Sequence, residues 1–134
     1  MQPPAGGTAE AFLTKALQNL AAAEADYAAA RYDACANRTY YCCFQAAIAA
    51  LLVEGLQPPG GRQQWSHDFV HAQFAGVLVG QRRRFPPDLR RTLQDNRDVR
   101  DRADYRPMPV TGDVAGRALR RARVFVLAVQ EHIR

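Results

Sequence analysis

The chain has 134 residues, of which 48% are hydrophobic, and this is enough for one domain to bury a core without metals or disulfides. The longest apolar stretch, residues 40–53, has 14 residues, whereas a membrane helix needs roughly 20. The N-terminus has neither the basic region nor the apolar region of a secretory signal, so we expect a cytoplasmic protein.

The formal net charge of +5 is unevenly distributed along the chain. Residues 1–61 carry three basic side chains against five acidic ones, a net charge of −2, whereas residues 62–134 carry 15 arginines against eight acids, a net charge of +7. Arginine is a planar multiple donor that suits phosphates, so the basic half predicts contact with nucleic acid or a nucleotide. An arginine-rich and alanine-rich composition that reflects genomic base composition explains the same charge.

Two helices are predicted in the first half of the chain. Thr8 can cap a first helix that continues to about Ala30, because apolar residues recur there at three- and four-residue steps. Residues 1–7 before it are expected to be a disordered tail. After a short turn at residues 31–33, a second helix with a broad apolar stripe ends before Gly55.

Three cysteines lie on the second predicted helix, at positions Cys35, Cys42 and Cys43. Their spacing on one helix suits neither a disulfide framework nor a zinc site. We interpret them as small buried hydrophobic residues.

Residues 57–61 contain two prolines and two glycines and cannot continue a helix. Ser66 can cap a third helix that runs to Gly80. In this helix His67 and His71 are four residues apart and could share a metal, but no third ligand completes a motif such as His-Glu-x-x-His. We therefore interpret both histidines as packing residues and predict no metal site.

Two more helices are predicted in the basic half. Pro86 and Pro87 fit the start of a fourth helix, and a fifth begins near residues 111–113 and repeats apolar residues at helical spacing to Ile133. No segment favours a β-strand. The sequence therefore predicts an all-α fold, an up-down four-helix bundle with an additional short helix, in a single domain over residues 8–134.

The fourth helix places Arg100 and Asp104 on the same face as Leu89, Leu93 and Asn96, so both charged residues continue a core-facing stripe. An arginine there must find an anion or acceptors inside the bundle or across a subunit interface. One interpretation is a structural pair with Asp104, although arginine preceding aspartate is the weaker orientation.

The other interpretation of this run is functional. Arg100 would hold a phosphate or a transition-state charge, with Asp104 as a base and Tyr105 as a donor or stacking ring. This arrangement suits phosphodiester cleavage or nucleotide binding.

A second polar and aromatic cluster, formed by Asn37, Arg38, Tyr40 and Tyr41, interrupts the apolar second helix. A buried asparagine or arginine needs a partner, and the end of the fourth helix is a natural candidate. The sequence has no glycine-rich phosphate loop, no Gly-x-Ser-x-Gly elbow and no metal-ligand set, so we predict no cofactor.

Three motifs occur in order along the chain: Asn37-Arg38-Thr39-Tyr40-Tyr41, then Ser66-His67, then Arg100-x-x-Ala-Asp-Tyr105. Together they resemble the HEPN superfamily of prokaryotic helical domains from about Thr8 to His132. The resemblance implies a helical bundle, usually dimeric, with the arginine motif at the dimer cleft. Many members are metal-independent ribonucleases, often toxins paired with a nucleotidyltransferase-type antitoxin.

The active members of the family carry Arg-x4–6-His, whose arginine and histidine act on the scissile phosphate of RNA. This sequence departs from that pattern, because Asp104 follows Arg100 by four residues and no histidine occurs between His71 and His132. A carboxylate is a poor acid at neutral pH, so the loss of the histidine should weaken general acid–base cleavage.

We therefore expect a cytoplasmic homodimer that binds RNA or a nucleotide at an Arg100-centred cleft and pairs with a nucleotidyltransferase-type antitoxin. The residues expected in catalytic positions are Arg100, Asp104 and Tyr105, and those expected to bind nucleic acid or nucleotide are Arg97, Arg102, Asn37, Arg38 and Tyr41. One alternative is a weak metal-independent ribonuclease toxin that uses the first three residues. Another is a non-catalytic protein-interaction module.

Overall fold

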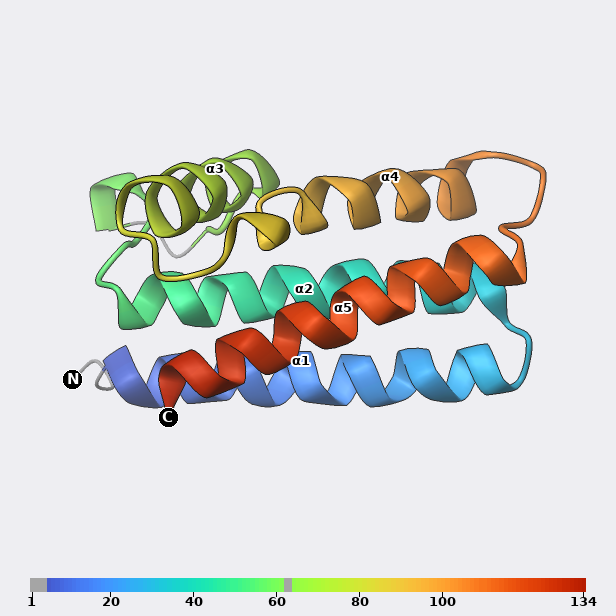
Figure 1. The fold of residues 1–134 in the computed structure, drawn as a ribbon, viewed down its shortest axis with the longest axis horizontal. Helices are drawn as coiled ribbons and strands as arrows, with labels where there is room; N and C mark the ends of the chain where they lie inside the picture. The colour runs from blue at the N-terminus through green and yellow to red at the C-terminus, as the bar shows by residue number, and fades with distance from the viewer. Residues whose placement is uncertain (1–4, 62–63) are drawn as a thin grey trace.

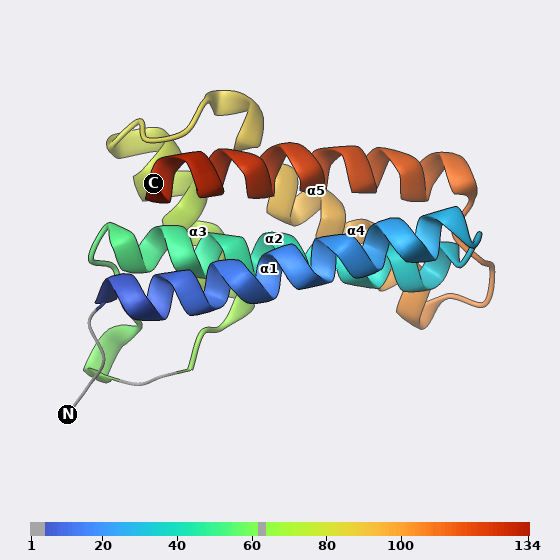
Figure 2. The same ribbon diagram turned by 90° about the horizontal axis from the view of Figure 1, so that it is seen from below.

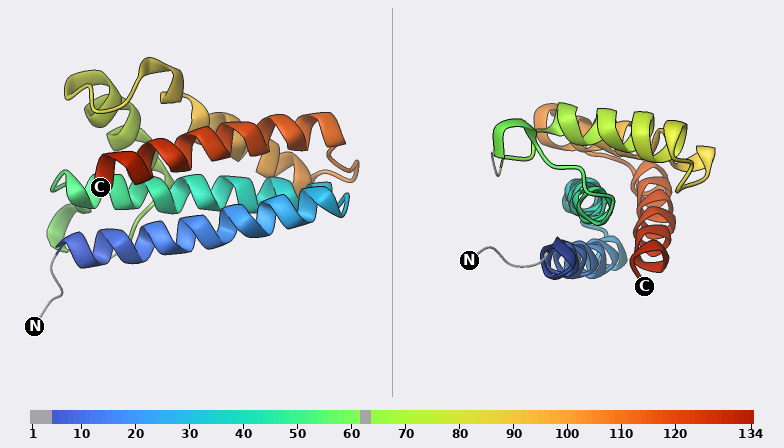
Figure 3. Two further views of the ribbon diagram at one scale, coloured as in Figure 1. Left: turned by 60° about the horizontal axis from the view of Figure 1, so that its bottom comes forward. Right: turned by 90° about the vertical axis from the view of Figure 1, so that its left-hand side faces the viewer.

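The computed structural model describes residues 5–61 and 64–134, and within these ranges the regular structure is helical, without β-strands. The α-helices are α1 (Ala5–Ala28), α2 (Tyr32–Val53), α3 (His67–Gln73), α4 (Thr92–Tyr105) and α5 (Gly112–Ile133). The four longer helices run along the long axis of the molecule (Figure 1), and α3 runs across it, as the right-hand view of Figure 3 shows. The predicted all-α bundle of five helices is confirmed.

Helix α2 is the centre of the bundle, because α1, α3, α4 and α5 all pack against it. Figure 2 shows α1 and α5 on the near side of the molecule and α4 on the far side. From Tyr40 to Leu52 all side chains of α2 except those of Tyr41 and Gln45 are buried. The 14-residue apolar stretch is therefore an internal helix, and none of the described helices is both long and apolar enough to cross a membrane.

The three cysteines of α2 are free thiols and are buried, as their interpretation as small hydrophobic residues requires. Burial raises the pKa of the Cys35 thiol to about 11, so this group stays uncharged at neutral pH. Buried neutral thiols of this kind pack as apolar side chains.

The N-terminus of α1 differs from the prediction. The helix begins at Ala5, so residues 5–7, expected to belong to a disordered tail, are helical, and Thr8 is not the N-cap. The cost of a glycine in a helix is only about 1 kcal/mol, and a long helix that is already formed extends cooperatively through such positions. Residues 1–4 of the expected tail lie outside the described residues.

Other helix ends follow the local sequence. Helix α2 stops at Gly55, whose φ of +77° is a left-handed conformation that glycine adopts without strain. The amides of Gly55 and Leu56 donate to the carbonyls of Leu52 and Leu51, which is the hydrogen-bond pattern of a Schellman cap. Thr111 caps the N-terminal end of α5, because its side chain accepts a hydrogen bond from the Val114 amide at 3.2 Å.

The connection between α3 and α4 is less regular than predicted. Helix α3 passes directly into a π-helical segment, η2 (Phe74–Gln81), and Pro87 begins only a single 3₁₀ turn, η3 (Pro87–Leu89). Helix α4 starts after that turn, at Thr92, so the predicted start at the proline pair is wrong. Proline presets the backbone for one turn but does not determine whether an α-helix follows.

Two glycines let the first turns of α5 approach aromatic side chains at the junction of α1 and α2. A Cβ atom at Gly112 would lie 3.0 Å from the Tyr32 ring, and one at Gly116 would lie 3.0 Å from the Tyr27 hydroxyl. These close approaches explain why small residues occupy the first turns of α5.

Candidate functional site

Arg100 lies near the C-terminal end of α4, and its guanidinium is held by three described partners. Its Nε donates to Asp104 at 3.1 Å, one Nη to Asp101 at 3.1 Å, and the other Nη to the Tyr41 hydroxyl at 3.2 Å. A guanidinium has five N–H donors, so these bonds leave two of them for a ligand. The partial burial predicted for Arg100 is confirmed, because its side chain is 15% exposed.

Three tyrosine rings surround this guanidinium. The Arg100 Cζ atom lies 5.5 Å from the centre of the Tyr41 ring, 5.7 Å from that of Tyr105 and 5.9 Å from that of Tyr40. Burial alone would lower the pKa of Arg100, but Tyr41, Tyr105 and the two aspartates outweigh burial and raise its pKa above the ordinary value. The cation is thus permanent and sits among aromatic faces, a favourable place for a guanidinium.

Asp104 connects α4 to α2. Its carboxylate accepts hydrogen bonds from the Asn37 amide at 3.1 and 3.4 Å in addition to the bond from Arg100. The expectation that a partner lies at the end of the fourth helix is therefore confirmed for Asn37 and wrong for Arg38, which donates to Asn19 of α1. We call Arg100, Asp101, Asp104, Asn37 and Tyr41 the Arg100 cluster.

Helix α4 ends beside the cluster because of a proline. Arg106 precedes Pro107 and has an extended backbone (φ −110°, ψ 146°), as residues before proline usually do. This stops the helix at Tyr105, which leaves the ring of Tyr105 72% exposed at the edge of the cluster.

The other residues expected to bind nucleic acid, Arg97, Arg102 and Arg38, are not part of the Arg100 cluster. Arg97 is partly buried and forms an ion pair of 3.6 Å with Asp68 at the start of α3, while Arg102 is exposed. Arg38 donates to Asn19 of α1 at 3.0 Å, so the structure does not bring its guanidinium into the cluster.

The structure brings two further residues to this region that the sequence interpretation treated as packing residues. The Tyr40 hydroxyl lies 2.5 Å from His67 Nδ1 and 2.8 Å from His71 Nε2, so it bridges the two imidazoles. We call these three residues the Tyr40 triad. The signal in the sequence was the four-residue spacing of the histidines, which places both on the face of α3 that meets α2.

The position of His67 follows from the cap of α3. Ser66 accepts a hydrogen bond from the Phe69 amide at 3.1 Å and so starts the helix one residue before His67. The imidazole then stacks on the Phe44 ring, with centroids 4.6 Å apart, and on the Tyr40 ring at 5.5 Å. His67 is thereby packed against α2.

Burial shifts the pKa values of the whole triad. It lowers the pKa of His67 and His71 below 6.5, and nearby Arg97 lowers both further. It also raises the pKa of the Tyr40 hydroxyl well above its ordinary value of 10. The three groups are therefore neutral at pH 7.

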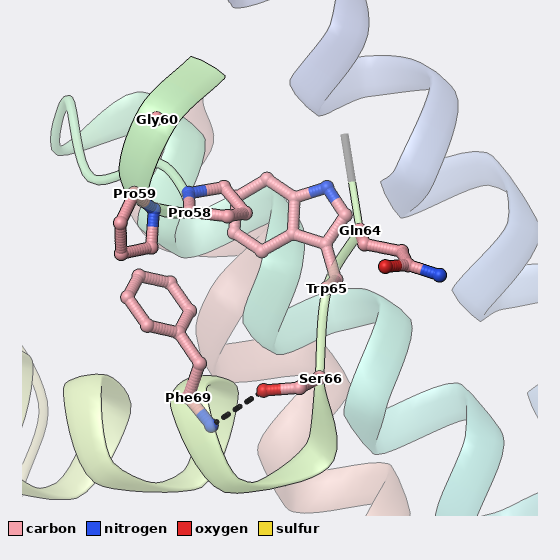
Figure 4. A pocket seen from close by; sticks show the side chains of 7 residues that line it. All are labelled: Pro58, Pro59, Gly60, Gln64, Trp65, Ser66 and Phe69. Atoms are coloured by element: carbon pink, nitrogen blue, oxygen red, sulfur yellow. Dashed lines mark hydrogen bonds between the residues drawn. The ribbon is translucent and has the colours of Figure 1, made fainter. Parts of the chain in front are cut away.

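A cavity of about 690 Å³ opens beside the N-terminal end of α3. Its aromatic lining comes from Trp65 and Phe69, whose ring centroids are 6.2 Å apart, and its other lining residues are Pro58, Pro59, Gly60, Gln64 and Ser66. Figure 4 shows the Phe69 ring directed towards the loop that carries Pro59 and the Gln64 amide directed away from that loop. The cavity adjoins the site because Ser66 lines it and His67 follows directly.

Among the described residues, no group of three or more histidine, cysteine or acidic side chains is arranged to hold a metal ion. The chemistry available at the site is that of a guanidinium, carboxylates, phenols and neutral imidazoles. Such groups bind phosphates and transfer protons.

Comparison with known proteins identifies one family. The sequence model of the HEPN domain matches residues 9–132, which include every residue of the Arg100 cluster and of the Tyr40 triad. No curated protein sequence matches the chain.

Proposed function

The chain belongs to the HEPN domain family, and from this premise we propose that it binds RNA through the Arg100 cluster. The observation that carries the proposal is the Arg100 guanidinium, which is held in a fixed orientation by three hydrogen bonds and keeps two N–H donors free. A planar guanidinium with paired donors matches the geometry of a phosphate.

The aromatic residues around the cluster favour single-stranded RNA. The exposed ring of Tyr105 lies beside Arg100, and the cavity at Trp65 and Phe69 lies at the N-terminal end of α3, next to His67. Unpaired bases can stack on such rings, whereas the bases of a duplex are inaccessible to them. We expect a single strand to compete for the site better than a duplex of the same sequence.

The carboxylates of the cluster limit its affinity for phosphate. Asp101 and Asp104 together carry one more charge than Arg100, so a phosphate must share the guanidinium with both of them. Binding therefore needs the surrounding arginines, of which Arg97 and Arg102 are on the same helix. We expect modest affinity that falls steeply as the salt concentration rises.

We also propose that the chain works as a homodimer. Tyr105, which contacts Arg100, and Met108, three residues further along the chain, are 72% and 78% exposed. A second copy that covers them would join two clusters in one cleft. The mass of one chain is 14.9 kDa, and sedimentation equilibrium at micromolar concentration should give twice this mass. A monomer under these conditions would exclude the shared cleft.

The partner that we propose is a nucleotidyltransferase-type antitoxin, as is common in this family. Co-expression of this chain with a nucleotidyltransferase-type antitoxin from the same genome should give a complex that survives size-exclusion chromatography. Separate elution of the two proteins would contradict this assignment.

The test of RNA binding uses a fluorescently labelled single-stranded RNA and anisotropy at low salt. Arg100→Gln should weaken binding about tenfold, because a charged hydrogen bond to phosphate contributes roughly 1.5 kcal/mol. It should also lower the slope of log K against log salt by about 0.7, the share of one phosphate contact on a single strand.

The matched control is Arg134→Gln, which removes the same charge at the C-terminus, at the opposite end of the bundle from the end of α4 (Figure 1). This variant should bind RNA within about twofold of the wild type. Equal losses in both variants would show that net charge alone drives binding. Displacement of the RNA by free nucleotides at similar concentration would instead favour a nucleotide ligand.

A further inference from the structure

We propose that the outer face of α5 is a self-association surface, on which a second copy of this chain packs its own α5 in the antiparallel direction. The contact is distinct from the cleft proposed at the Arg100 cluster and does not depend on RNA binding. It is carried by a stripe of exposed residues on α5, because the apolar and charged members of this stripe complement the same stripe running in the opposite direction.

The exposed residues of α5 follow a seven-residue repeat. After the first turn, all of them except Arg123 are spaced alternately by three and four residues, which places them on one face of the helix. They are Arg117, Arg120, Val124, Leu127, Glu131 and the C-cap residue Arg134. Two helices that pack along their length do so through faces with this spacing.

Two apolar side chains form the centre of the stripe. Val124 is 58% exposed and Leu127 is 47% exposed, and their spacing of three residues makes them neighbours on the helix surface. The buried face of α5 packs against α1, α2 and α4, so these two side chains are directed away from the bundle. A second helix that covers them removes apolar surface from water, which favours association.

The charges on the two sides of this centre are opposite in sign. Arg120 lies four residues before Val124, and Glu131 lies four residues after Leu127. In an antiparallel pair centred between the two apolar residues, Val124 packs against Leu127 of the second copy. Arg120 then lies opposite Glu131 of the second copy. A two-fold axis repeats both contacts, so the surface is complementary to itself, as an isologous interface requires.

Both charged groups are available for a partner. Arg120 forms no ion pair or hydrogen bond with any of the described residues. Glu131 pairs with Arg134 at 3.3 Å, but the two side chains are 74% and 66% exposed, and an exposed pair of this kind contributes little. Arg123 differs from both, because it pairs with Glu24 of α1 at 3.2 Å. Pairing across the proposed interface therefore breaks no strong contact.

The outer part of the interface limits its strength. The same register places Arg117 opposite Arg134 of the second copy, and these like charges repel each other. Two pairs of aliphatic side chains bury less than the roughly 1,200 Å² of a standard interface. We therefore expect a dissociation constant on the order of 100 μM, which is typical of a weak contact.

The surface is separate from the Arg100 cluster. Helix α5 begins at the end of the bundle where α4 ends (Figure 1), and Val124 lies 12 residues after Gly112. At 1.5 Å per residue this is about 18 Å along the helix. An antiparallel partner therefore places the two Arg100 clusters at opposite ends of the assembly, with no residue of either cluster in the contact.

The test is sedimentation equilibrium at concentrations from about 5 to about 500 μM, which span the expected dissociation constant. The average mass of the wild type should rise at least about 1.5-fold above its value at the lowest concentration. Arg120→Glu and Glu131→Arg should each abolish the rise, because each variant places like charges opposite one another twice.

A mixture of these two variants should restore the rise. One copy then carries only acidic side chains at the two positions and the other carries only basic ones, so both pairs across the interface are favourable again. Leu127→Gln should weaken the association at least about threefold, because it removes apolar contact at the centre. All these side chains are exposed, so circular dichroism should show unchanged helical content.

The net charge of the variants separates a specific contact from general repulsion. Arg120→Glu lowers the formal net charge from +5 by two, to +3, so it reduces the overall repulsion between molecules. The matched control Arg91→Glu makes the same change at a side chain before α4 that is 77% exposed, and it should keep the rise in mass.

Several results would overturn the proposal. A wild-type mass that stays constant up to about 500 μM would do so. The same holds for a rise that persists in both single variants, for a mixture of the two that does not associate, and for a loss of the rise in Arg91→Glu. Binding of RNA is measured separately by anisotropy, so none of these outcomes decides the function proposed for the Arg100 cluster.

Discussion

The partners of Arg100 determine how strongly its guanidinium can hold a phosphate. The side chains of Asp101 and Asp104 are 45% and 28% exposed, so both carboxylates beside Arg100 are accessible to solvent. Asp104 is additionally fixed by Asn37, whereas the hydrogen bonds in the structure show only Arg100 as a partner of the Asp101 carboxylate among the described residues. Asp101 is therefore the carboxylate that competes most directly with RNA.

Replacing Asp101 with asparagine should tighten RNA binding about fivefold. The change removes a negative charge close to the phosphate, which is worth roughly 1 kcal/mol near a solvent-exposed surface, and it keeps the size of the side chain. Anisotropy with the labelled single-stranded RNA measures the effect. Asp98→Asn is the control, because Asp98 accepts a hydrogen bond from Gln94 rather than from Arg100. Weaker binding by Asp101→Asn would mean that Asp101 orients Arg100 instead of competing for it.

The residues of the site show what a sequence pattern can and cannot determine. The helical stripe correctly placed Arg100 at the border of the core, because its neighbours on that face are set by the helical repeat. The triad could not be found in this way. Tyr40 is 27 residues from His67 and 31 from His71, and only the crossing of α3 over α2 brings them together.

At the scale of helices, local chemistry predicted the ends that depend on a single cap. Ser66, Thr111 and Gly55 cap their helices as their side chains and backbone preferences require. The starts of α1 and α4 were predicted less well, because several residues near each start can adopt helical backbone angles. Tertiary packing then decides where such a helix begins.

Helices α4 and α5 are joined by a buried polar contact at Asn96. Its amide donates to the Ala118 carbonyl at 3.1 Å, and its side-chain oxygen accepts from Arg121 Nε at 2.8 Å. Asn96 is fully buried, so these bonds replace those that it would make with water. The contact fixes the angle at which α4 presents Arg100.

Asn96→Ala should destabilise the protein by about 2 kcal/mol, because it removes the buried contact with Ala118 and leaves Arg121 without its acceptor. Urea unfolding followed by circular dichroism measures the change. Asp95→Ala is the control on the same helix, since among the described residues the Asp95 carboxylate forms an exposed pair with Arg91 at 3.8 Å, and it should cost less than about 0.5 kcal/mol. A loss for Asn96→Ala as small as that of the control would show that the contact is not structural.

At the scale of the whole molecule, the fold was predictable because the apolar pattern of each helix shows which of its faces is buried. The apolar repeat of α5 and the nearly continuous apolar run of α2 identify an outer and a central helix, and a bundle is the arrangement that buries both. The Arg100 cluster depends instead on contacts between residues 59 to 67 positions apart. Only the assembled bundle defines that part of the site.

The stability of the molecule should fall on acidification in two stages. Burial holds the pKa of His67 and His71 below 6.5, so the unfolded chain binds protons first and stability is lost as the pH falls below that value. Burial would raise the pKa of Glu54, but hydrogen bonds from His132, Arg84 and Arg82 outweigh it and hold the pKa below 4.5. Its contribution is therefore present above about pH 4.5 and is lost below it.

The midpoint of thermal unfolding, measured as a function of pH, should show both stages. Glu54→Gln should abolish the stage near pH 4.5 and leave the stage below pH 6.5 unchanged, because only the stage near pH 4.5 involves the contact of Glu54 with His132 of α5. A wild-type midpoint that stays constant on acidification from neutral pH to about pH 5 would contradict the neutral burial of the two histidines.

The central claim is that the end of α4 binds RNA through Arg100, and an NMR titration of the isotope-labelled protein with single-stranded RNA tests it most directly. We predict that the Arg100 Nε–H resonance and the signals of Tyr41 and Tyr105 shift progressively as RNA is added, while those of Arg134 at the opposite end of the bundle stay in place. Shifts confined to other surfaces, with the Arg100 Nε–H resonance unchanged at saturation, would contradict the account.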